Sequence, residues 1–469
     1  MKRFIYQIGR FDFNYMNEMN FVYENKNYKK YLSSFALKEY FGKDTYVVLI
    51  YPVSIVYNND VVRNLLEKKS DSFAQKVESE IDNYLLDPKE FLKNHPHNEQ
   101  ADGFIVIHSF GEYKKPNDLG KQEFKSTYDD IVLEILVDLI ERYLEVSENK
   151  EETEFYFDIS SGHNIYISAM LESARHFSVF SQLMNWLNKN LRPKIYLSFS
   201  DPILGSLASV YNVYIQSLTF QAFFSSPLKK EDIDGENKIK ISKKLFPDIE
   251  DENEKKENRR KRKILEDFLV FFSAIKNNTP LVLYHFEYNN YNEIINLLKE
   301  ILVDLKDKFS NNWQNSPKLS KDDYLKAILS LGFYAGIAEV LFDNDIKKCS
   351  DGVGLDKIKN KFGSYGNSIY EYFGLKSHIP LLGDEIHKLE EEYKVDGKTL
   401  KEVAPINWTK LKEFVRGERE EFVGRNFIAH AGFERTITEI KGENGKLHFR
   451  YDNRAEEKIK NVLKEYMGA

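Results

Sequence analysis

An alternation of short apolar runs with longer helical stretches across residues 1–225 constrains the fold more than any other feature of the sequence. Runs rich in Val, Ile, Phe and Tyr predict strands at 4–8, 45–56, 104–108, 155–159, 194–198 and 212–218. Apolar residues at three- and four-residue steps predict helices at 60–87, 128–146 and 165–187. Strands that alternate with helices form a mostly parallel, doubly wound sheet. We therefore expect an α/β domain over residues 1–225.

A polar turn follows the strand predicted at 155–159, and a predicted helix begins directly after it. The turn consists of Asp158, Ile159, Ser160, Ser161, Gly162, His163 and Asn164. Ligands of parallel sheets bind beyond the carboxyl ends of strands, and the free amides of a helix N-terminus suit a phosphate. The turn is therefore a candidate ligand site. Ordinary helix capping is the alternative, because Ser, Asp and Asn are also the usual N-cap residues.

The middle of the chain changes character. Residues 226–262 are dense in charge and include the basic run Arg259-Arg260-Lys261-Arg262, which predicts a solvated linker or the start of a helix. Residues 263–469 have mainly helical patterns. Gly, Pro and Asp punctuate 306–323 and 343–405, so we expect loops and short helices there. A short strand at 446–451 and a helix at 455–466 are predicted near the end of the chain.

A polar group in an apolar setting stands near the C-terminus. Arg425, Asn426 and His430 alternate with Phe422, Val423, Phe427 and Ile428. Arginine is a permanent bidentate partner for a phosphate, and histidine exchanges a proton near neutral pH. These residues are therefore candidates for metal-independent phosphodiester cleavage. The alternative is an exposed arginine beside a histidine that merely ends a helix.

The apolar spacing before this group predicts one long helix from Trp408 to Phe427, with Gly432 as its C-terminal cap. Positions five apart diverge by about 140° on a regular helix, so Arg425 and His430 do not share one stripe. Either the helix end is distorted, or a second helix completes the site. That second helix could come from another copy of the chain.

Composition excludes several other classes of protein. The formal net charge is −7, so any contact with nucleic acid must use a local basic patch. Cys349 is the only cysteine and the histidines lack ligand spacing, so we predict no disulfide framework and no metal site. The sequence contains neither a P-loop nor a Gly-x-Ser-x-Gly motif. We find no signal-peptide core and no apolar run of membrane-spanning length, so we expect a cytoplasmic protein that binds no membrane.

Both polar motifs resemble those of known families. Arg425-Asn426-Phe427-Ile428-Ala429-His430 resembles the R-N-x-x-x-H signature of HEPN ribonucleases. The turn from Asp158 to Asn164 resembles the Asp-Ile-Thr-His-Gly-x-Asn motif of CARF domains, the Rossmann-like sensors of CRISPR-associated proteins. Ser160 stands at the position of the threonine, Ser161 at that of the histidine, and a histidine follows at 163. Gly9 and Arg10 occupy the place of the family's first ligand loop.

This order of motifs is similar to that of the ancillary CARF–HEPN ribonucleases of type III CRISPR antiviral defence. The resemblance implies an α/β Rossmann-like CARF sensor at 1–225, a linker at 226–262 and an all-α HEPN domain at 263–469. It implies a homodimer or a higher oligomer that cuts single-stranded RNA without metal or cofactor, leaving 2′,3′-cyclic phosphate and 5′-hydroxyl ends. The activator would be a cyclic oligoadenylate, with cyclic tetra-adenylate the expected ring.

Under this resemblance each candidate residue has a role. Arg425, Asn426 and His430 would be catalytic. The activator would be bound by Gly9, Arg10, Asp158, Ser160, Ser161, Gly162, His163 and Asn164. A rival interpretation is a CARF-type, ligand-responsive transcriptional regulator, or another binding module, without nuclease activity. It requires a helix-turn-helix, and residues 256–275 have charge and a helical pattern but no convincing turn.

Overall fold

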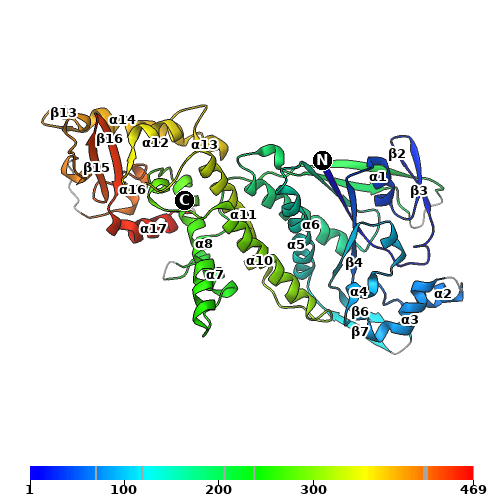
Figure 1. Ribbon diagram of the computed structural model, residues 1–469. Helices are drawn as coiled ribbons and strands as arrows, with labels where there is room; N and C mark the ends of the chain where they lie inside the picture. The colour runs from blue at the N-terminus through cyan, green and yellow to red at the C-terminus, as the bar shows by residue number, and fades with distance from the viewer. Residues whose placement is uncertain (69–70, 118–119, 204–207, 236–237, 416–420, 468–469) are drawn as a thin grey trace. The chain divides into compact units, whose positions relative to one another are not determined.

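The chain forms two compact units, drawn in Figure 1. The computed structural model describes residues 1–469 except 69–70, 118–119, 204–207, 236–237, 416–420 and 468–469. Unit 1 comprises Met1–Ser181, Asn188–Gln221 and Lys299–Leu325. Unit 2 comprises Gln182–Leu187, Ala222–Leu298 and Lys326–Ala469. The units are therefore not simple consecutive segments, because a stretch from the second half of the chain belongs to unit 1.

An eight-stranded sheet is the centre of unit 1, with the order β3-β2-β10-β9-β8-β1-β4-β5. Its five parallel strands are β1 (Lys2–Ile8), β4 (Thr45–Pro52), β5 (Gly103–Ile107), β8 (Thr153–Asp158) and β9 (Lys194–Ser200). β10 (Tyr211–Leu218) runs antiparallel to β9 and beside the hairpin of β2 (Met19–Tyr23) and β3 (Lys26–Lys30). The predicted strands and the α/β fold class are confirmed. The β2–β3 hairpin was not predicted.

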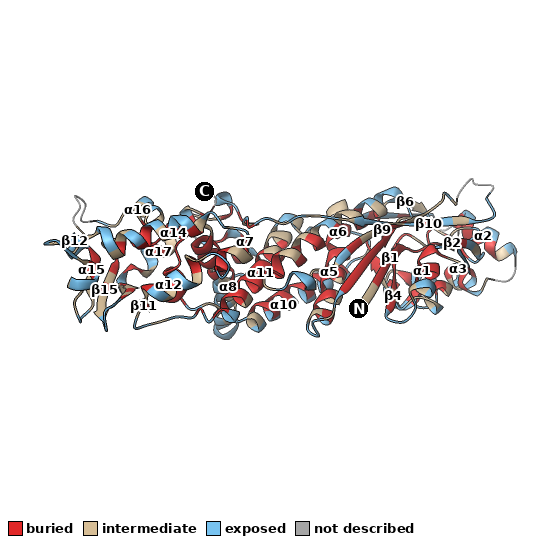
Figure 2. Cartoon of the chain, turned by 90° about the horizontal axis from the view of Figure 1, so that it is seen from above, coloured by how far each residue is buried: buried red, intermediate tan, exposed pale blue. Residues whose placement is uncertain are grey.

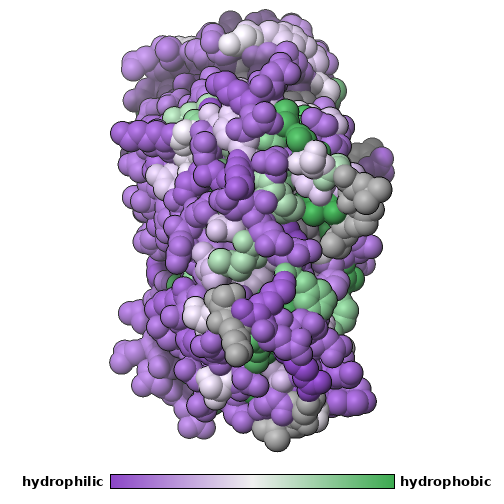
Figure 3. All heavy atoms as spheres, turned by 90° about the vertical axis from the view of Figure 1, so that its right-hand side faces the viewer, coloured by the Kyte–Doolittle hydropathy of each residue, from purple (hydrophilic) through white to green (hydrophobic). Residues whose placement is uncertain are grey.

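Helices cover both faces of this sheet. Ile5, Val47 and Leu49 pack in one buried cluster with residues of α1 (Ser33–Phe41), α2 (Asn59–Glu67), α3 (Ser72–Tyr84) and α4 (Pro88–Leu92). On the other face, the Tyr6 hydroxyl donates to Asp138 of α5 (Tyr128–Ser147) over 2.7 Å, and Phe155 packs against Phe177 of α6 (Asn164–Met184). The strands are accordingly buried on both sides (Figure 2). The outer face seen in Figure 3 is mostly hydrophilic, with small separate apolar groups.

Residues 109–113 follow the predicted strand at 104–108 and have the polar, glycine-containing composition of a loop, but the expectation of a loop is wrong. Residues 110–114 form β6 (Phe110–Lys114), which pairs antiparallel with β7 (Lys121–Lys125). Strand β6 lacks the apolar alternation that marks a half-buried strand, because it contains Gly111, Glu112 and Lys114 and only partly buried aromatic residues. Cross-strand pairing, rather than burial, therefore makes it a strand.

The segment between α10 (Tyr291–Ser310) and α11 (Lys321–Asp343) is bound to the rest of unit 1. The Lys125 N–H donates to the Gln314 carbonyl over 2.7 Å, and the Ser316 N–H donates to the Lys125 carbonyl over 3.1 Å. The loop predicted at 306–323 is accordingly confined to the residues between these two helices. By length and composition, α11 is the one described helix that could cross a membrane, but 72% of its most apolar window is buried, as in a core helix.

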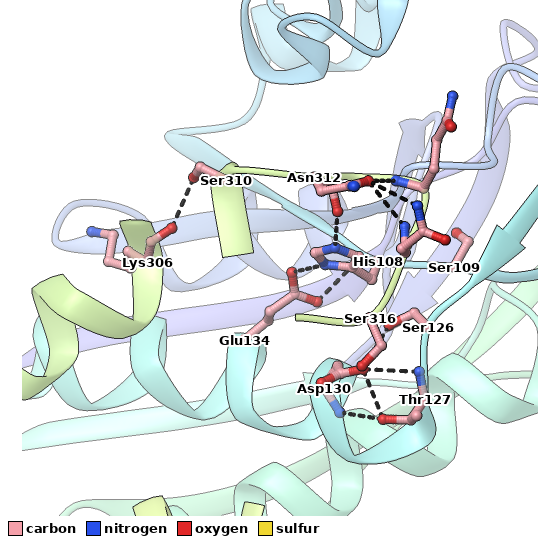
Figure 4. A network of polar contacts seen from close by, with 12 residues as sticks. His108, Ser109, Ser126, Thr127, Asp130, Glu134, Lys306, Ser310, Asn312 and Ser316 are labelled. Carbon is pink, nitrogen blue, oxygen red and sulfur yellow. Dashed lines mark hydrogen bonds and ion pairs between the residues drawn. The ribbon is translucent and has the colours of Figure 1, made fainter. Parts of the chain in front are cut away.

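A buried histidine also holds this segment (Figure 4). His108 lies just beyond β5, with its Nδ1 2.6 Å from a carboxylate oxygen of Glu134 on α5 and its Nε2 2.9 Å from the Asn312 carbonyl. Both ring nitrogens face acceptors, which favours the doubly protonated imidazolium. Burial lowers the pKa of His108, but the Glu134 carboxylate more than offsets this and raises it to about 9.

Unit 2 is mainly helical, which confirms the predicted fold class of the C-terminal half. Its longer helices are α8 (Glu252–Lys276), part of α10, most of α11, α14 (His378–His387) and α17 (Glu456–Glu465). Shorter helices are α7 (Lys240–Leu245), α9 (Val282–His285), α12 (Leu355–Phe362), α13 (Ile369–Tyr372), α15 (Leu400–Val403) and α16 (Gly424–Ala429). The ribbon of β12 (Lys394–Val395) and β13 (Lys398–Thr399) connects them, together with the single-turn segments η3 (Lys230–Asp232), η4 (Lys388–Glu392), η5 (Leu411–Glu413) and η6 (Asn453–Ala455). Phe268, Phe272 and Phe333 are fully buried at its core.

A small sheet accompanies these helices. Its order is β11 (Val353–Gly354), β16 (Lys446–Tyr451), β15 (Thr438–Glu443) and β14 (Thr409–Lys410). Of these strands, only the one at 446–451 was predicted. The charged segment 226–262 contains α7 and the first turns of α8, so the helix-start interpretation holds for residues 252–262; residues 236–237 lie outside the described part.

Candidate functional site

The Arg–Asn–His group lies on the short helix α16 and directly after it. Phe427 is fully buried, with its ring 5.9 Å from that of Tyr451 and 6.0 Å from that of Phe422. Gly424 lies so close to α17 that a Cβ there would be 2.8 Å from Val462 Cγ2. These contacts fix the inner face of α16. Arg425 is left exposed, while Asn426 and His430 are half-buried.

The helix end is distorted at His430. This was one of the two alternatives in the sequence analysis, the other being a second helix that completes the site. His430 still donates its N–H to the Asn426 carbonyl over 3.0 Å, but Ala431 and Gly432 have φ angles of +49° and +85°. The Gly432 N–H returns to the Phe427 carbonyl over 2.8 Å, and the Tyr451 hydroxyl donates to the Gly432 carbonyl over 2.9 Å. Gly432 therefore ends the helix in the left-handed conformation that glycine tolerates, as predicted.

The long helix predicted from Trp408 to Phe427 is wrong. Thr409 and Lys410 instead form β14, paired with Ile440 and Glu439 of β15, and η5 (Leu411–Glu413) follows. Residues 416–420 of the predicted helix lie outside the described part. The Trp408 ring is held by the Arg450 guanidinium, 4.5 Å from its centroid. Pairing with a distant strand overrode a local helical pattern, as tertiary context often does.

His430 has a carboxylate partner that the sequence did not reveal. Its Nδ1 lies 3.2 Å from Oε1 of Glu385 on α14, whose side chain is only 5% exposed. The hydrogen bond with Glu385 raises the pKa of His430, although burial opposes the shift. Burial would raise the pKa of Glu385, but its bonds with His430 and Lys388 lower it on balance. Glu385 lies 45 residues from His430, in a region predicted only as loops and short helices, so no spacing rule could have found it.

The side chains of Arg425 and Asn426 differ from that of His430 in this respect. Within the described part of the chain, no hydrogen bond or ion pair engages the Arg425 guanidinium or the Asn426 amide. An exposed guanidinium can bind a phosphate in bidentate fashion, and the adjacent amide can donate to a phosphate oxygen. The structure therefore places an anion-binding side chain and a proton-exchanging side chain within one short helix and its C-cap.

The second polar site lies where the strand order of unit 1 reverses, between β1 and β8. Such a switch point is the usual ligand crevice of an open α/β sheet. The turns after the two strands meet there: the Ser161 hydroxyl donates to the Ile8 carbonyl over 2.8 Å and accepts from the Gln7 amide over 3.0 Å. Gly162 has a φ of +112°, and a Cβ there would lie 2.6 Å from Ile8 Cβ. The turn at 158–164 therefore packs against the end of β1 through a residue that must be glycine.

Several predicted ligand residues hold the backbone in place. Asp158 is fully buried and accepts from the Ser160 N–H over 2.9 Å, while the Ser160 hydroxyl accepts from the Ser200 N–H over 2.8 Å. Gly9 passes so close to Tyr51 that a Cβ there would lie 2.1 Å from its ring. Arg10 is 8% exposed and bonds Asp12 through Nε at 2.9 Å. These four residues act mainly as supports in this conformation.

His163 and Asn164 are the exposed side chains of this turn. Asn164 is the first residue of α6, and no described residue donates a hydrogen bond to its side-chain amide or accepts one from it. Its side chain therefore does not cap the helix, which weakens the capping interpretation for this residue. The amide lies beside the first turn of a 21-residue helix, where an anion is favoured.

Comparisons with known proteins match segments in both halves of the chain. A family model described as the CARF domain of the CRISPR system endoribonuclease Csx1 matches residues 4–202, and one described as the HEPN domain of the same protein matches residues 375–454. The chain is also similar to the CRISPR system endoribonuclease Csx1 of Methanocaldococcus jannaschii, with 25% identity over 313 residues. That match spans 63% of this chain and 62% of the relative. The polar turn and the Arg–Asn–His group each fall inside one of the matched segments.

Proposed function

Because the chain belongs to the CARF–HEPN family of CRISPR-associated proteins, we propose that it is a metal-independent endoribonuclease switched on by a cyclic oligoadenylate. The observation that carries the proposal is the arrangement around α16. An exposed Arg425 and a half-exposed His430 lie on one fixed helical turn, with the imidazole anchored by Glu385. Transesterification of RNA requires a group that binds the phosphate and a group that exchanges a proton, and Arg425 and His430 can supply them.

In the proposed reaction the RNA 2′-hydroxyl attacks the adjacent phosphorus and the 5′-oxygen leaves. The products are a 2′,3′-cyclic phosphate and a 5′-hydroxyl end. His430 moves a proton as general acid or base, Arg425 stabilises the charge on the phosphorane, and Asn426 orients a phosphate oxygen. The nucleophile belongs to the substrate, so the protein supplies position, charge and a proton path.

The activator site in this proposal is the exposed part of the 158–164 turn. Asn164 and His163 contact the nucleotide, Gly162 keeps the turn packed against the end of β1, and the first turn of α6 receives a phosphate. Asp158, Ser160, Ser161, Gly9 and Arg10 shape the crevice from behind. Cyclic tetra-adenylate is the ring we expect.

The active form in this proposal is a cytoplasmic homodimer or a higher oligomer. Two copies of residues 424–431 would face each other and form one composite site. A symmetric dimer would also pair two sensor turns for a cyclic ligand of matching symmetry. The ligand activates only if it binds the active arrangement more tightly than the idle one.

The structure of residues 256–275 argues against the rival interpretation as a transcriptional regulator. Residues 256–275 lie within α8, which is continuous from Glu252 to Lys276. A helix-turn-helix needs a turn in this stretch.

The test is incubation with labelled single-stranded RNA in EDTA, with and without cyclic tetra-adenylate. We expect cleavage that the activator accelerates, and 5′ ends that a polynucleotide kinase labels without prior phosphatase treatment. No cleavage under any activator, together with binding of duplex DNA, would support the regulator instead.

A further inference from the structure

We propose that Glu385 is a positioning residue that holds the Nδ1–H of His430 and thereby presents Nε2 as the nitrogen that exchanges the proton with RNA. The inference rests on the proposed function, which assigns His430 to proton transfer but does not say which nitrogen acts or what orients the ring. It adds a residue that lies outside the R-N-x-x-x-H motif, on α14.

The geometry of the pair supports this role. Glu385 Oε1 lies 3.2 Å from His430 Nδ1, and its other oxygen lies 3.2 Å from the Lys388 ammonium. The carboxylate is 5% exposed, whereas the His430 side chain is 43% exposed. The inner side of the imidazole is therefore held within the protein, and the rest of the ring remains accessible to a substrate.

The carboxylate also decides the protonation pattern of the ring. A carboxylate only accepts hydrogen bonds, so Nδ1 must carry a proton in both the neutral and the charged imidazole. Nε2 then has a lone pair in the neutral form and a proton in the charged form. It is the nitrogen that can serve as base or acid, as in catalytic histidines oriented by a buried carboxylate.

The other charged groups around His430 modify this effect without replacing it. Lys388 lowers the pKa of His430 and Glu434 raises it, and both effects are smaller than that of Glu385. The Glu434 carboxylate is engaged with the Thr436 N–H at 2.8 Å and the Thr436 hydroxyl at 2.5 Å. Glu385 is thus the carboxylate that sets the orientation and charge of the ring.

The test compares Glu385→Gln with the wild type in the full-length protein. The amide keeps the shape of the side chain but removes its charge. The matched control is Glu390→Gln, which removes a partly buried carboxylate five residues further along the chain that pairs with Lys359 rather than His430. Two measurements are made: the NMR titration of the His430 imidazole in ¹³C-histidine-labelled protein, assigned with His430→Ala, and the pH–rate profile of RNA cleavage.

We expect Glu385→Gln to lower the His430 pKa, to shift the matching limb of the pH–rate profile to lower pH, and to reduce kcat by ~10-fold or more with little change in KM. Glu390→Gln should match the wild type in all three. An unchanged His430 pKa, or a changed pKa with an unaltered pH profile and kcat, would overturn the proposal. Should the wild type cleave no RNA, the proposed function would fail, while the NMR titration would still show whether Glu385 controls His430.

Discussion

Individual side chains at the two sites divide into those that hold the backbone and those that remain available to a ligand. The Asp158 carboxylate accepts from the Ser160 N–H and the Ser160 hydroxyl accepts from the Ser200 N–H at the end of β9, whereas Asn164 is exposed. On α16 the buried anchor is Phe427, and Arg425 faces outward. Substitutions at the first kind should damage the local fold, and those at the second should remove function alone.

Replacing either His430 or Arg425 with alanine should abolish RNA cleavage without unfolding the protein. Loss of a general acid or base typically costs roughly a hundredfold or more in rate. Cleavage of labelled RNA and the melting temperature are measured together. Arg454→Ala is the control, because Arg454 is 94% exposed on the same unit and lies outside the site. Near wild-type cleavage by either site variant would remove that residue from the mechanism.

Asn164→Ala should weaken the binding of cyclic tetra-adenylate and raise the concentration that activates cleavage, while basal cleavage and the melting temperature stay unchanged. Ser160→Ala should lower both affinity and melting temperature, because the Ser160 hydroxyl accepts the Ser200 N–H. Calorimetry and thermal denaturation separate the two effects. Equal affinity in Asn164→Ala and wild type would show that this amide does not touch the activator.

At the scale of secondary-structure elements, α7 and the first half of α8 form a basic cavity in unit 2. Its volume is about 360 Å³, and it is lined by Lys238, Ser242, Lys243, Asp248, Arg259, Arg262, Lys263 and Glu266. The chain as a whole is acidic, with a net charge of −7, so a local basic surface is where an RNA backbone would be attracted. Two residues of the basic run that the sequence singled out, Arg259 and Arg262, line the cavity.

Arg259→Gln combined with Lys263→Gln should weaken RNA binding and flatten its salt dependence. Each lost contact between a cation and a single-stranded phosphate reduces the slope of log K against log salt by about 0.7. Binding is measured at several salt concentrations in the His430→Ala background, where RNA stays intact. Lys299→Gln, which alters a lysine paired with Glu148 in unit 1, is the control. An unchanged slope would exclude this cavity from the RNA path.

The pairing of α5 with the α10–α11 segment through His108 should make stability depend on pH. The folded-state pKa of about 9 lies above the ordinary value near 6.5, so the stabilisation is complete below about pH 6.5 and is lost as pH rises through 9. The full effect is up to about 3 kcal/mol. The melting temperature of the wild type should fall more steeply from pH 6.5 to 9.5 than that of His108→Gln. Parallel curves would mean that His108 is neutral in the folded protein.

At the scale of the whole molecule, the arrangement of the catalytic residues bears on how many chains form one active site. One chain contributes a single Arg425 and a single His430, which lie on the short helix α16 and directly after it. A composite site made by two copies, as the family resemblance implies, would provide both an acid and a base for the reaction.

Mixing an excess of His430→Ala protein into the wild type, with subunit exchange allowed, should therefore depress cleavage below the level of simple dilution. Scattering should show a dimer or a larger assembly at assay concentrations without activator. Wild-type protein mixed with an equal excess of Arg454→Ala protein controls for exchange itself. Activity that follows dilution alone, or a fully active monomer, would refute the composite site.

The positions of the central strands of unit 1, their mostly parallel pairing, the polar turn after β8 and the Arg–Asn–His group were all predictable from residue patterns. Strands buried on both faces are continuous apolar runs, and a motif is local by definition. The β2–β3 and β6–β7 hairpins, the strand at 409–410 and the Glu385–His430 pair were not predictable. Strand β14 and His430 depend on partners distant in sequence, β15 and a carboxylate 45 residues away. Each hairpin pairs locally, but it is also bound to a distant segment: β2 pairs with β10, and Lys125 of β7 bonds Gln314 and Ser316. Local periodicity indicates which residues of a segment are buried. The hydrogen-bond partners that a segment finds elsewhere in the chain are decided only when the segments pack together.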